Sequence, residues 1–239
     1  MLFMKRLKQP AMPKRYKLLA GFTLAEVLIT LGIIGVIAAL TIPTLVHNIQ
    51  NAKYYSAFQK SYSTMSQLTE TLVLENGDMA GAISAYGSLA NAYKAKAKVM
   101  KFCPESPTDS GCMPVNISMI DNTPTLPEYY WYDCLVLADG MAMAIQTIAD
   151  SCNYDFGGSF QNGCGTIYLD TNGISKPNQI GRDVFYFNIT KDRLFPQGMP
   201  GTTMEWTPDN IWYCNPEITD PNSGTACASR LVQEGKMDY

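Results

Sequence analysis

The sequence predicts an α+β fold: a long N-terminal α-helix, membrane-spanning in its first half, packed on an antiparallel β-sheet of about four strands with disulfide-bounded loops. Three observations favour it. An apolar run continues without a break into helical periodicity, short runs rich in β-branched and aromatic residues follow, and the cysteines stand in Gly-, Pro- and Asn-rich surroundings. We divide the chain into a basic leader (1–21), a membrane helix (22–43), its amphipathic continuation (44–76) and an exported globular domain (77–239).

The charge distribution is uneven along the chain. Of 18 Lys and Arg residues, six lie before Gly21 and no acid accompanies them, whereas the remainder carries 12 basic and 21 acidic residues. Binding to phosphates needs basic residues clustered on one face, and the acidic body has no such stripe. We therefore predict no nucleic-acid partner.

The first predicted element is a helix that begins at Phe22. From Phe22 to Ile42 the chain is apolar except for three threonines and Glu26, and about 20 apolar residues in a helix cross a bilayer core of about 30 Å. The basic residues before it predict a cytoplasmic N-terminus and an exported body. Helical periodicity continues to about residue 76, where Gly77 is a stop signal, and Pro43 is expected to kink the helix.

Glu26 is out of place in such a segment, because an acid inside a membrane span costs about 2.5–3.5 kcal/mol unless it finds a partner. Lying one turn from the cytoplasmic edge, it could reach the lipid headgroups. Alternatively, a cut between Gly21 and Phe22 would create an α-amino group four residues away. The new cation could then pair with a Glu26 carboxylate of its own or a neighbouring subunit.

The stretch "GFTLAEVLITLGIIGVIAALTIP" (21–43) resembles the class III signal of type IV pilins and type II secretion pseudopilins. These have a basic leader ending in Gly, then Phe, then an apolar helix with Glu at its fifth residue. The resemblance implies cleavage after Gly21 and N-methylation of Phe22 by a prepilin peptidase. It also implies that Glu26 neutralises the N-terminus of an adjacent subunit during assembly, and that Pro43 matches a helix-kinking proline.

The same resemblance implies the partners and the location. The partners are the prepilin peptidase, identical or related pilin subunits and an inner-membrane assembly platform. The chain would begin as a single-pass protein of the bacterial inner membrane and end in a periplasmic or surface filament. The alternative is an exported binding or enzymatic domain that uses the signal only as an anchor. No GxSxG motif occurs and His47 is the single histidine, so nothing predicts an enzyme.

In the exported domain we expect a second helix over 84–102, an irregular loop over 104–128 and then strands. Asp139-Gly140 between two apolar runs predicts a hairpin over 134–145. Strands are expected at 165–170 and 183–190, with the chain turning back at 191–196, and a short helix at 228–235. The aromatic cluster at 129–133 is expected to pack near the junction of helix and sheet, with a sugar-binding platform as the alternative.

The seven cysteines predict an oxidising compartment. Close spacing suggests three local disulfides and leaves Cys134 over, although sequence does not determine connectivity. Structural zinc is disfavoured because there is no CxxC and only one histidine. The candidate pairs are Cys103 with Cys112, Cys152 with Cys164, and Cys214 with Cys227.

A possible calcium site lies in "LDTNGISKPNQIGRDVF" (169–185). Its oxygen-bearing residues Asp170, Asn172, Asn178 and Asp183 surround a turn at Gly173, and oxygen ligands suit Ca²⁺. Some pseudopilins carry a calcium-stabilised loop in their sheet region, and this segment is similar to it. The segment lacks the twelfth-position Glu of an EF-hand, and Asp, Asn and Gly also dominate plain turns. No other cofactor is expected.

Overall fold

The computed structural model describes residues 21–105, 108–125 and 131–239. The predicted leader falls outside these ranges except for Gly21, as do Tyr129 and Tyr130 of the aromatic cluster. The chain divides into two compact units, one up to Val46 and the other from His47 to Tyr239. We describe each unit by itself.

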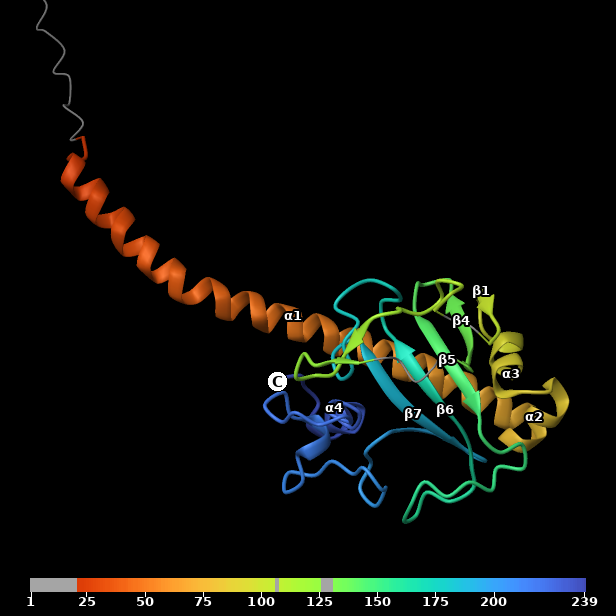
Figure 1. The fold of residues 1–239 in the computed structure, drawn as a ribbon. Coiled ribbons are helices and arrows are strands. Elements are labelled where there is room, and N and C mark those ends of the chain that lie inside the picture. Colours follow the sequence, from red (N-terminus) through yellow and green to blue (C-terminus); the bar gives the residue numbers. More distant parts are fainter. Residues whose placement is uncertain (1–20, 106–107, 126–130) are drawn as a thin grey trace, which may run out of the picture. The chain divides into compact units, whose positions relative to one another are not determined.

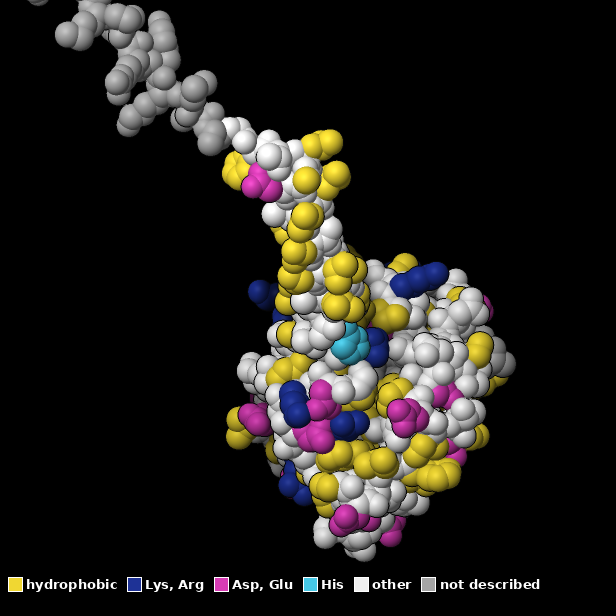
Figure 2. All heavy atoms as spheres, turned by 90° about the vertical axis from the view of Figure 1, so that its left-hand side faces the viewer, with side chains coloured by type: hydrophobic (Ala, Val, Ile, Leu, Met, Phe, Trp, Pro, Cys, Tyr) yellow, Lys and Arg dark blue, Asp and Glu magenta, His cyan; other side chains and the backbone are white. Residues whose placement is uncertain are grey.

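The described part of the first unit is helical. The helix α1 covers Leu24–Asn76, and its residues up to Val46 belong to this unit. Large apolar side chains are exposed along the whole segment, and Figure 2 shows them covering the visible face of the helix. The helix is long and apolar enough to cross a membrane. Pro43 lies inside the helix and does not end it, although its missing N–H removes one backbone hydrogen bond.

The second unit is built around a sheet of six antiparallel strands in the order β1-β4-β5-β6-β7-β8. Figure 1 shows β4 to β7 side by side, with the second half of α1 passing behind them. A separate pair of short strands, β2 (Ile117–Ser118) and β3 (Pro124–Thr125), lies between β1 and β4 in the sequence. The strands of the sheet are β1 (Val99–Cys103), β4 (Asp133–Leu137), β5 (Ala142–Thr147), β6 (Gly163–Asp170), β7 (Val184–Thr190) and β8 (Leu194–Pro196).

Helices cover one face of this sheet. Phe58, Met65 and Leu72 of α1 are buried at intervals of seven residues, so they form one stripe of the helix. They pack in one core with alternate residues of β4 to β7, such as Ile167 and Phe187. The other helices that contribute to this core are α2 (Met79–Tyr86), α3 (Leu89–Lys96) and α4 (Cys227–Glu234).

The opposite face of the sheet is covered by loops and by the β2–β3 pair. Ala144, Tyr168 and Val184 point to this side and pack with Ile117 and Met119. Tyr132 also lies here, with its ring edge-on to Tyr168 at 5.6 Å, while Trp131 is 84% exposed. The expectation that this aromatic cluster packs at the helix–sheet junction is therefore wrong for its described members.

The predicted number of about four strands is too low, because the sheet has six. The predicted helix over 84–102 ends early: Gly87 takes a left-handed conformation after α2, and Ser88 caps a new helix, α3, with its side chain. The following Val99–Cys103 pairs with β4 as an edge strand. The second strand that was not predicted is β8, in which Leu194–Pro196 pair with β7.

The loop expected over 104–128 is not wholly irregular, because it contains the β2–β3 pair, and the other expected elements are present. Asp139-Gly140 joins β4 to β5, α1 ends at Asn76 before Gly77, and a short C-terminal helix follows Cys227. The structure contains the three suggested disulfides, Cys103–Cys112, Cys152–Cys164 and Cys214–Cys227. Cys134 is buried and unpaired. The last disulfide joins the 3₁₀ helix η2 (Trp212–Cys214) to the beginning of α4.

Candidate functional site

Three hydrogen bonds join Thr23 and Glu26 at the beginning of α1. The backbone N–H and the hydroxyl of Thr23 both donate to Oε2 of Glu26 at 2.8 Å, and the N–H of Glu26 donates to Oγ1 of Thr23 at 3.2 Å. This T-x-x-E arrangement is a capping box, which satisfies N–H groups that the first helical turn leaves without partners. The carboxylate of Glu26 therefore has a local partner before any bond of the chain is cut.

The residues just before this cap are accessible. Gly21 is exposed, and the side chain of Phe22 is 88% exposed. Phe22 and Glu26 line the same hollow of about 370 Å³, together with Val27 and Thr30. The bond expected to be cut, Gly21–Phe22, thus lies in accessible chain beside the only acidic residue between Met1 and Val46.

A second group of candidate residues lies where β6 ends and β7 begins. Asp170 is paired with Val184 across these strands, so Asp183 stands next to it. Both carboxyl groups are fully buried. The N–H groups of Asn178 and Gln179 donate to Oδ2 and Oδ1 of Asp183 at 2.9 and 2.6 Å. The structure thereby brings together residues that are up to 13 positions apart in the sequence.

Several oxygen atoms of this cluster are buried and have no partner within the described residues. They are Oδ2 of Asp170, Oγ1 of Thr171, Oδ1 of Asn172 and Oδ1 of Asn178. A buried polar atom without a hydrogen bond costs about 1–3 kcal/mol. These four oxygens, one of which belongs to the Asp170 carboxyl group, form with the Asp183 carboxyl group a set of acceptors that has no positive partner among the described residues.

The pKa values of the two carboxyl groups also indicate that this cluster lacks a positive partner. Burial, and then the negative charge of Asp183, raise the pKa of Asp170 from its ordinary 3.8 to about 8. Burial also raises the pKa of Asp183, although the N–H groups of Gln179 and Asn178 oppose this change. The pair therefore does not hold two negative charges at neutral pH unless a cation compensates them.

The chemistry of these donors fits the calcium predicted from the sequence. Carboxylate and amide oxygens are the ligands that Ca²⁺ prefers. Among the described residues no group of three or more His, Cys, Asp and Glu side chains comes together, and this cluster has only two acids. Soft metals that prefer His or Cys therefore do not fit it. Asp170, Asn172, Asn178 and Asp183 would hold the ion, with Thr171 as an additional oxygen.

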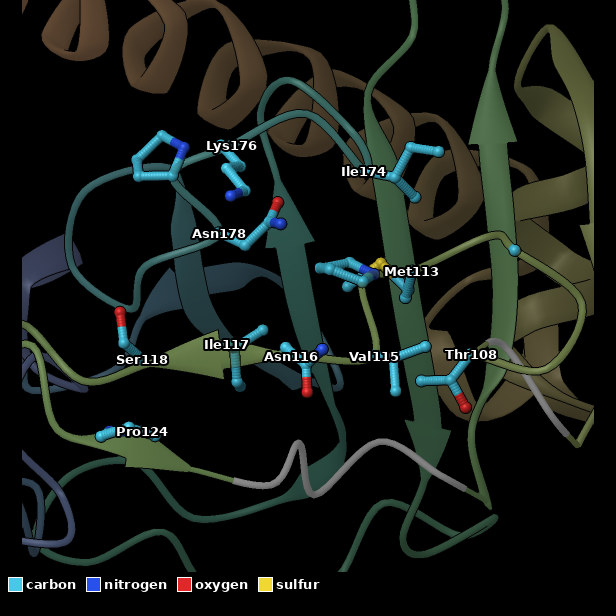
Figure 3. Close-up of a pocket in the computed structure, with 13 residues that line it drawn as sticks. Thr108, Met113, Val115, Asn116, Ile117, Ser118, Pro124, Ile174, Lys176 and Asn178 are labelled. Atoms are coloured by element: carbon cyan, nitrogen blue, oxygen red, sulfur yellow. The ribbon is translucent and has the colours of Figure 1, made fainter.

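Asn178 also lines a hollow of about 610 Å³, shown in Figure 3. Lys176 and Asn178 face the segment that carries Asn116, Ile117 and Ser118 across this space. The wall that carries part of the oxygen cluster is therefore in contact with solvent.

Comparison of the chain with protein-family models, with curated proteins and with solved structures gave no match.

Two residues of these sites were missed in the sequence. Thr23 could have been found, because Thr followed by Glu three residues later and then an apolar run is a readable capping signal. Thr171 could not, because only its burial beside the two carboxyl groups makes its hydroxyl a candidate ligand. The structure brings together the four residues predicted to bind calcium. The processing of the chain at Gly21 and Phe22 stays a prediction.

Proposed function

We propose that this chain is a subunit, a pilin, minor pilin or pseudopilin, of a type IV pilus or a type II secretion-like filament. It would be cut after Gly21 by a prepilin peptidase, N-methylated at Phe22 and assembled from the bacterial inner membrane through α1. The observation that carries the proposal is the combination of an accessible Gly21–Phe22 bond, Glu26 at the capped start of α1, and an apolar helix surface that the chain itself leaves uncovered.

The apolar surface supports assembly rather than anchoring alone. Apolar side chains are exposed around the helix up to Ile49, whereas a helix packed within a single domain has one apolar stripe and one polar face. Such a surface is covered either by lipid or by other apolar helices. In a filament core of identical helices, contacts with neighbouring helices would replace the contacts with lipid.

The positive charge that cleavage would create at Phe22 supports a role for Glu26 in aligning neighbouring subunits. A free amino group on Phe22 would stand at the positive end of the helix dipole, which repels a cation and attracts an anion. The Glu26 carboxylate of an adjacent subunit would relieve this repulsion. Burying one unpaired charge in an apolar core is costly, so pairing would favour subunits that are aligned at this position.

The first test is the mass of the native N-terminus. The proposal expects chains that begin at Phe22 and carry one methyl group on its nitrogen. A Gly21→Ala variant should remain uncut in the membrane. Native chains that retain the leader would instead support the alternative, a membrane-anchored binding or enzymatic domain.

A second test separates the charge of Glu26 from its capping role. Glutamine can replace glutamate in a capping box, so Glu26→Gln keeps the cap and loses the charge, whereas Glu26→Ala loses both. Both variants should be cut after Gly21 and should fail to enter filaments. The control is Glu70→Gln, an exposed glutamate farther along α1, which should assemble normally. Normal filaments from Glu26→Gln would disprove the proposed charge pairing.

A second proposal concerns the cluster around Asp170 and Asp183, which we infer to be a structural Ca²⁺ site. It is supported by the four buried oxygens without a partner among the described residues, one of them on Asp170, and by the buried carboxyl group of Asp183. The ion would join the end of β6 to the beginning of β7 and thereby stabilise the intervening loop 171–182. It has no catalytic role in this proposal.

A further inference from the structure

A groove with a volume of about 420 Å³ lies on the face of the sheet opposite to α1. Its volume is within the range of about 300–1,000 Å³ that is typical of small-molecule sites. The sheet forms its floor, and the β2–β3 pair and the segments around Tyr154 and Asn222 form its walls. The described lining residues come from β2, β3, β5, β6 and β7 and from the neighbouring loops.

One row of the floor is polar and uncharged. Gln146 of β5 is paired with Thr166 of β6, which is paired with Asn188 of β7, so an amide, a hydroxyl and a second amide lie side by side across three strands. The side chain of Asn188 is held in place, because its Nδ2 donates to Oε1 of Gln197. Amides and hydroxyls both donate and accept hydrogen bonds, so this row can match a ligand whose groups do the same.

The next row of the floor is aromatic. Tyr168 and Tyr186 are paired across β6 and β7 with ring centroids 3.8 Å apart, and Tyr132 meets Tyr168 edge-on. At the rim, Tyr154 and Phe156 lie 5.0 Å apart, and the Tyr154 side chain is exposed. Aromatic rings present large apolar surfaces at little cost in conformational entropy. The groove therefore offers apolar faces directly beside its polar row.

The described part of the groove's lining is uncharged. None of the described residues that line it is Asp, Glu, Lys, Arg or His. A charged ligand would lose its hydration here and gain no partner of opposite charge, which is unfavourable. This excludes phosphates, nucleic acids and strongly charged peptides as the preferred occupant. It favours a ligand that is rich in hydroxyl groups, is neutral, and has apolar faces of its own.

We propose that this groove binds an uncharged saccharide, with the partly exposed side chains of Gln146 and Thr166 hydrogen-bonding its hydroxyl groups beside the buried Asn188, and with Tyr154 and Phe156 packing on its C–H faces. The site is independent of the first unit, because every lining residue belongs to the second. It also lies on the face of the sheet that α1 leaves uncovered. The proposal does not rest on the proposed assembly, because saccharide binding does not require it.

The test uses the full chain purified in lauryldimethylamine oxide, because the head groups of maltoside detergents are themselves saccharides. The fluorescently labelled chain is applied to an array of neutral oligosaccharides and of their sialylated and sulfated counterparts. The proposal expects binding to one or more neutral glycans and weaker binding to the charged counterparts. The best glycan is then titrated by calorimetry, and it should also raise the melting temperature of the chain.

Two variants place the binding in the groove. Gln146→Ala removes one hydrogen-bonding side chain and Tyr154→Ala one aromatic ring, and neither residue is fully buried. Each should lower the affinity by about tenfold or more, since the loss of about 1.4 kcal/mol has that effect. Trp131→Ala is the control, because Trp131 is more exposed than Tyr154 and lies outside the groove.

Three results would overturn the proposal: no neutral glycan bound at millimolar concentration, a preference for charged glycans, or equal affinity in both groove variants and the control. If a variant melts earlier than the wild-type chain, the titration is done below its melting temperature. A fully folded Tyr154→Ala chain with unchanged affinity would contradict the site even if Gln146→Ala does not fold.

Discussion

At the scale of single residues, the acidic side chains of Glu26, Asp170 and Asp183 owe their properties to the groups that lie next to them. Glu26 is conspicuous in the sequence as a charge in an apolar run, yet its first partner is Thr23, three residues earlier. Asp170 and Asp183 are polar residues in a turn-rich segment, where turn formation alone would explain them. Only the register of β6 against β7 shows that both are buried and adjacent.

Calcium should stabilise the chain through Asp170. At a concentration about 100 times its dissociation constant, an ion bound only by the folded state adds about 2.7 kcal/mol. For a chain of this size that corresponds to a rise of about 5–10 °C in melting temperature relative to the protein in EGTA. Differential scanning fluorimetry of the full chain in detergent measures this rise. No shift at millimolar calcium would remove the proposed site.

Asp170→Asn should change the response in a specific way. The neutral side chain removes the repulsion between two buried acids, so the variant should melt above the wild-type chain in EGTA at pH 8. The same variant should lose the calcium-induced rise, because one charged ligand is gone. Asp150→Asn is the matched control, since Asp150 is exposed and should leave both melting temperatures unchanged. A variant that still responds fully to calcium would contradict the assignment.

The pH dependence of the calcium-free protein follows from the raised pKa of Asp170. The folded state holds its proton up to about pH 8, whereas the unfolded state releases it near pH 3.8. Between these values the folded state binds more protons, so stability falls as the pH rises. In EGTA the melting temperature should therefore be lower at pH 8 than at pH 5, after correction by the Asp170→Asn variant. Calcium should reduce this difference, because it replaces the proton.

At the scale of elements, the central strands were predictable and the edges were not. The strands β5, β6 and β7 are rich in apolar and β-branched residues and lie next to recognisable turns, whereas the edge strand β1 reads "VMKFC" and continues a helix-forming segment. Its strand conformation comes from pairing with β4, which no local signal in β1 encodes. The C-terminal end of α1 was predictable, because the helical spacing of its apolar residues continues up to the glycine, Gly77, that follows the helix.

The second half of α1 should contribute to stability through its buried stripe, and Phe58 is the member chosen to test this. This side chain is buried against Phe185 and Phe187, with ring centroids at 4.8 and 6.2 Å. Truncating a buried Phe to Ala costs about 3–5 kcal/mol, which should lower the melting temperature by about 10 °C. The neighbouring Gln59 is exposed, and Gln59→Ala should change the melting temperature by far less. Equal shifts would mean that α1 is not packed on the sheet as described.

At the scale of the whole molecule, the two faces of the sheet have different chemistry. The face toward α1 holds aliphatic and aromatic side chains, whereas the other holds the amide row, the tyrosines and the buried acids. Alternation along β6 and β7 produces this difference, because neighbouring residues point to opposite sides. The proposed assembly, calcium and saccharide sites thus occupy separate parts of the chain and can be altered one at a time.

The disulfides should stabilise the second unit, and the loop closed by Cys214 and Cys227 is the clearest case. This bond links residues 13 positions apart, and closing a loop of this length in the unfolded chain contributes about 3 kcal/mol. Cys214→Ser combined with Cys227→Ser should lower the melting temperature by about 5–10 °C. The control is a thiol titration: the denatured chain should show one reactive thiol, Cys134, before reduction and seven after it. Seven reactive thiols in the unreduced chain would mean that this bridge is absent from the native protein, and the double variant should then melt like the wild-type chain.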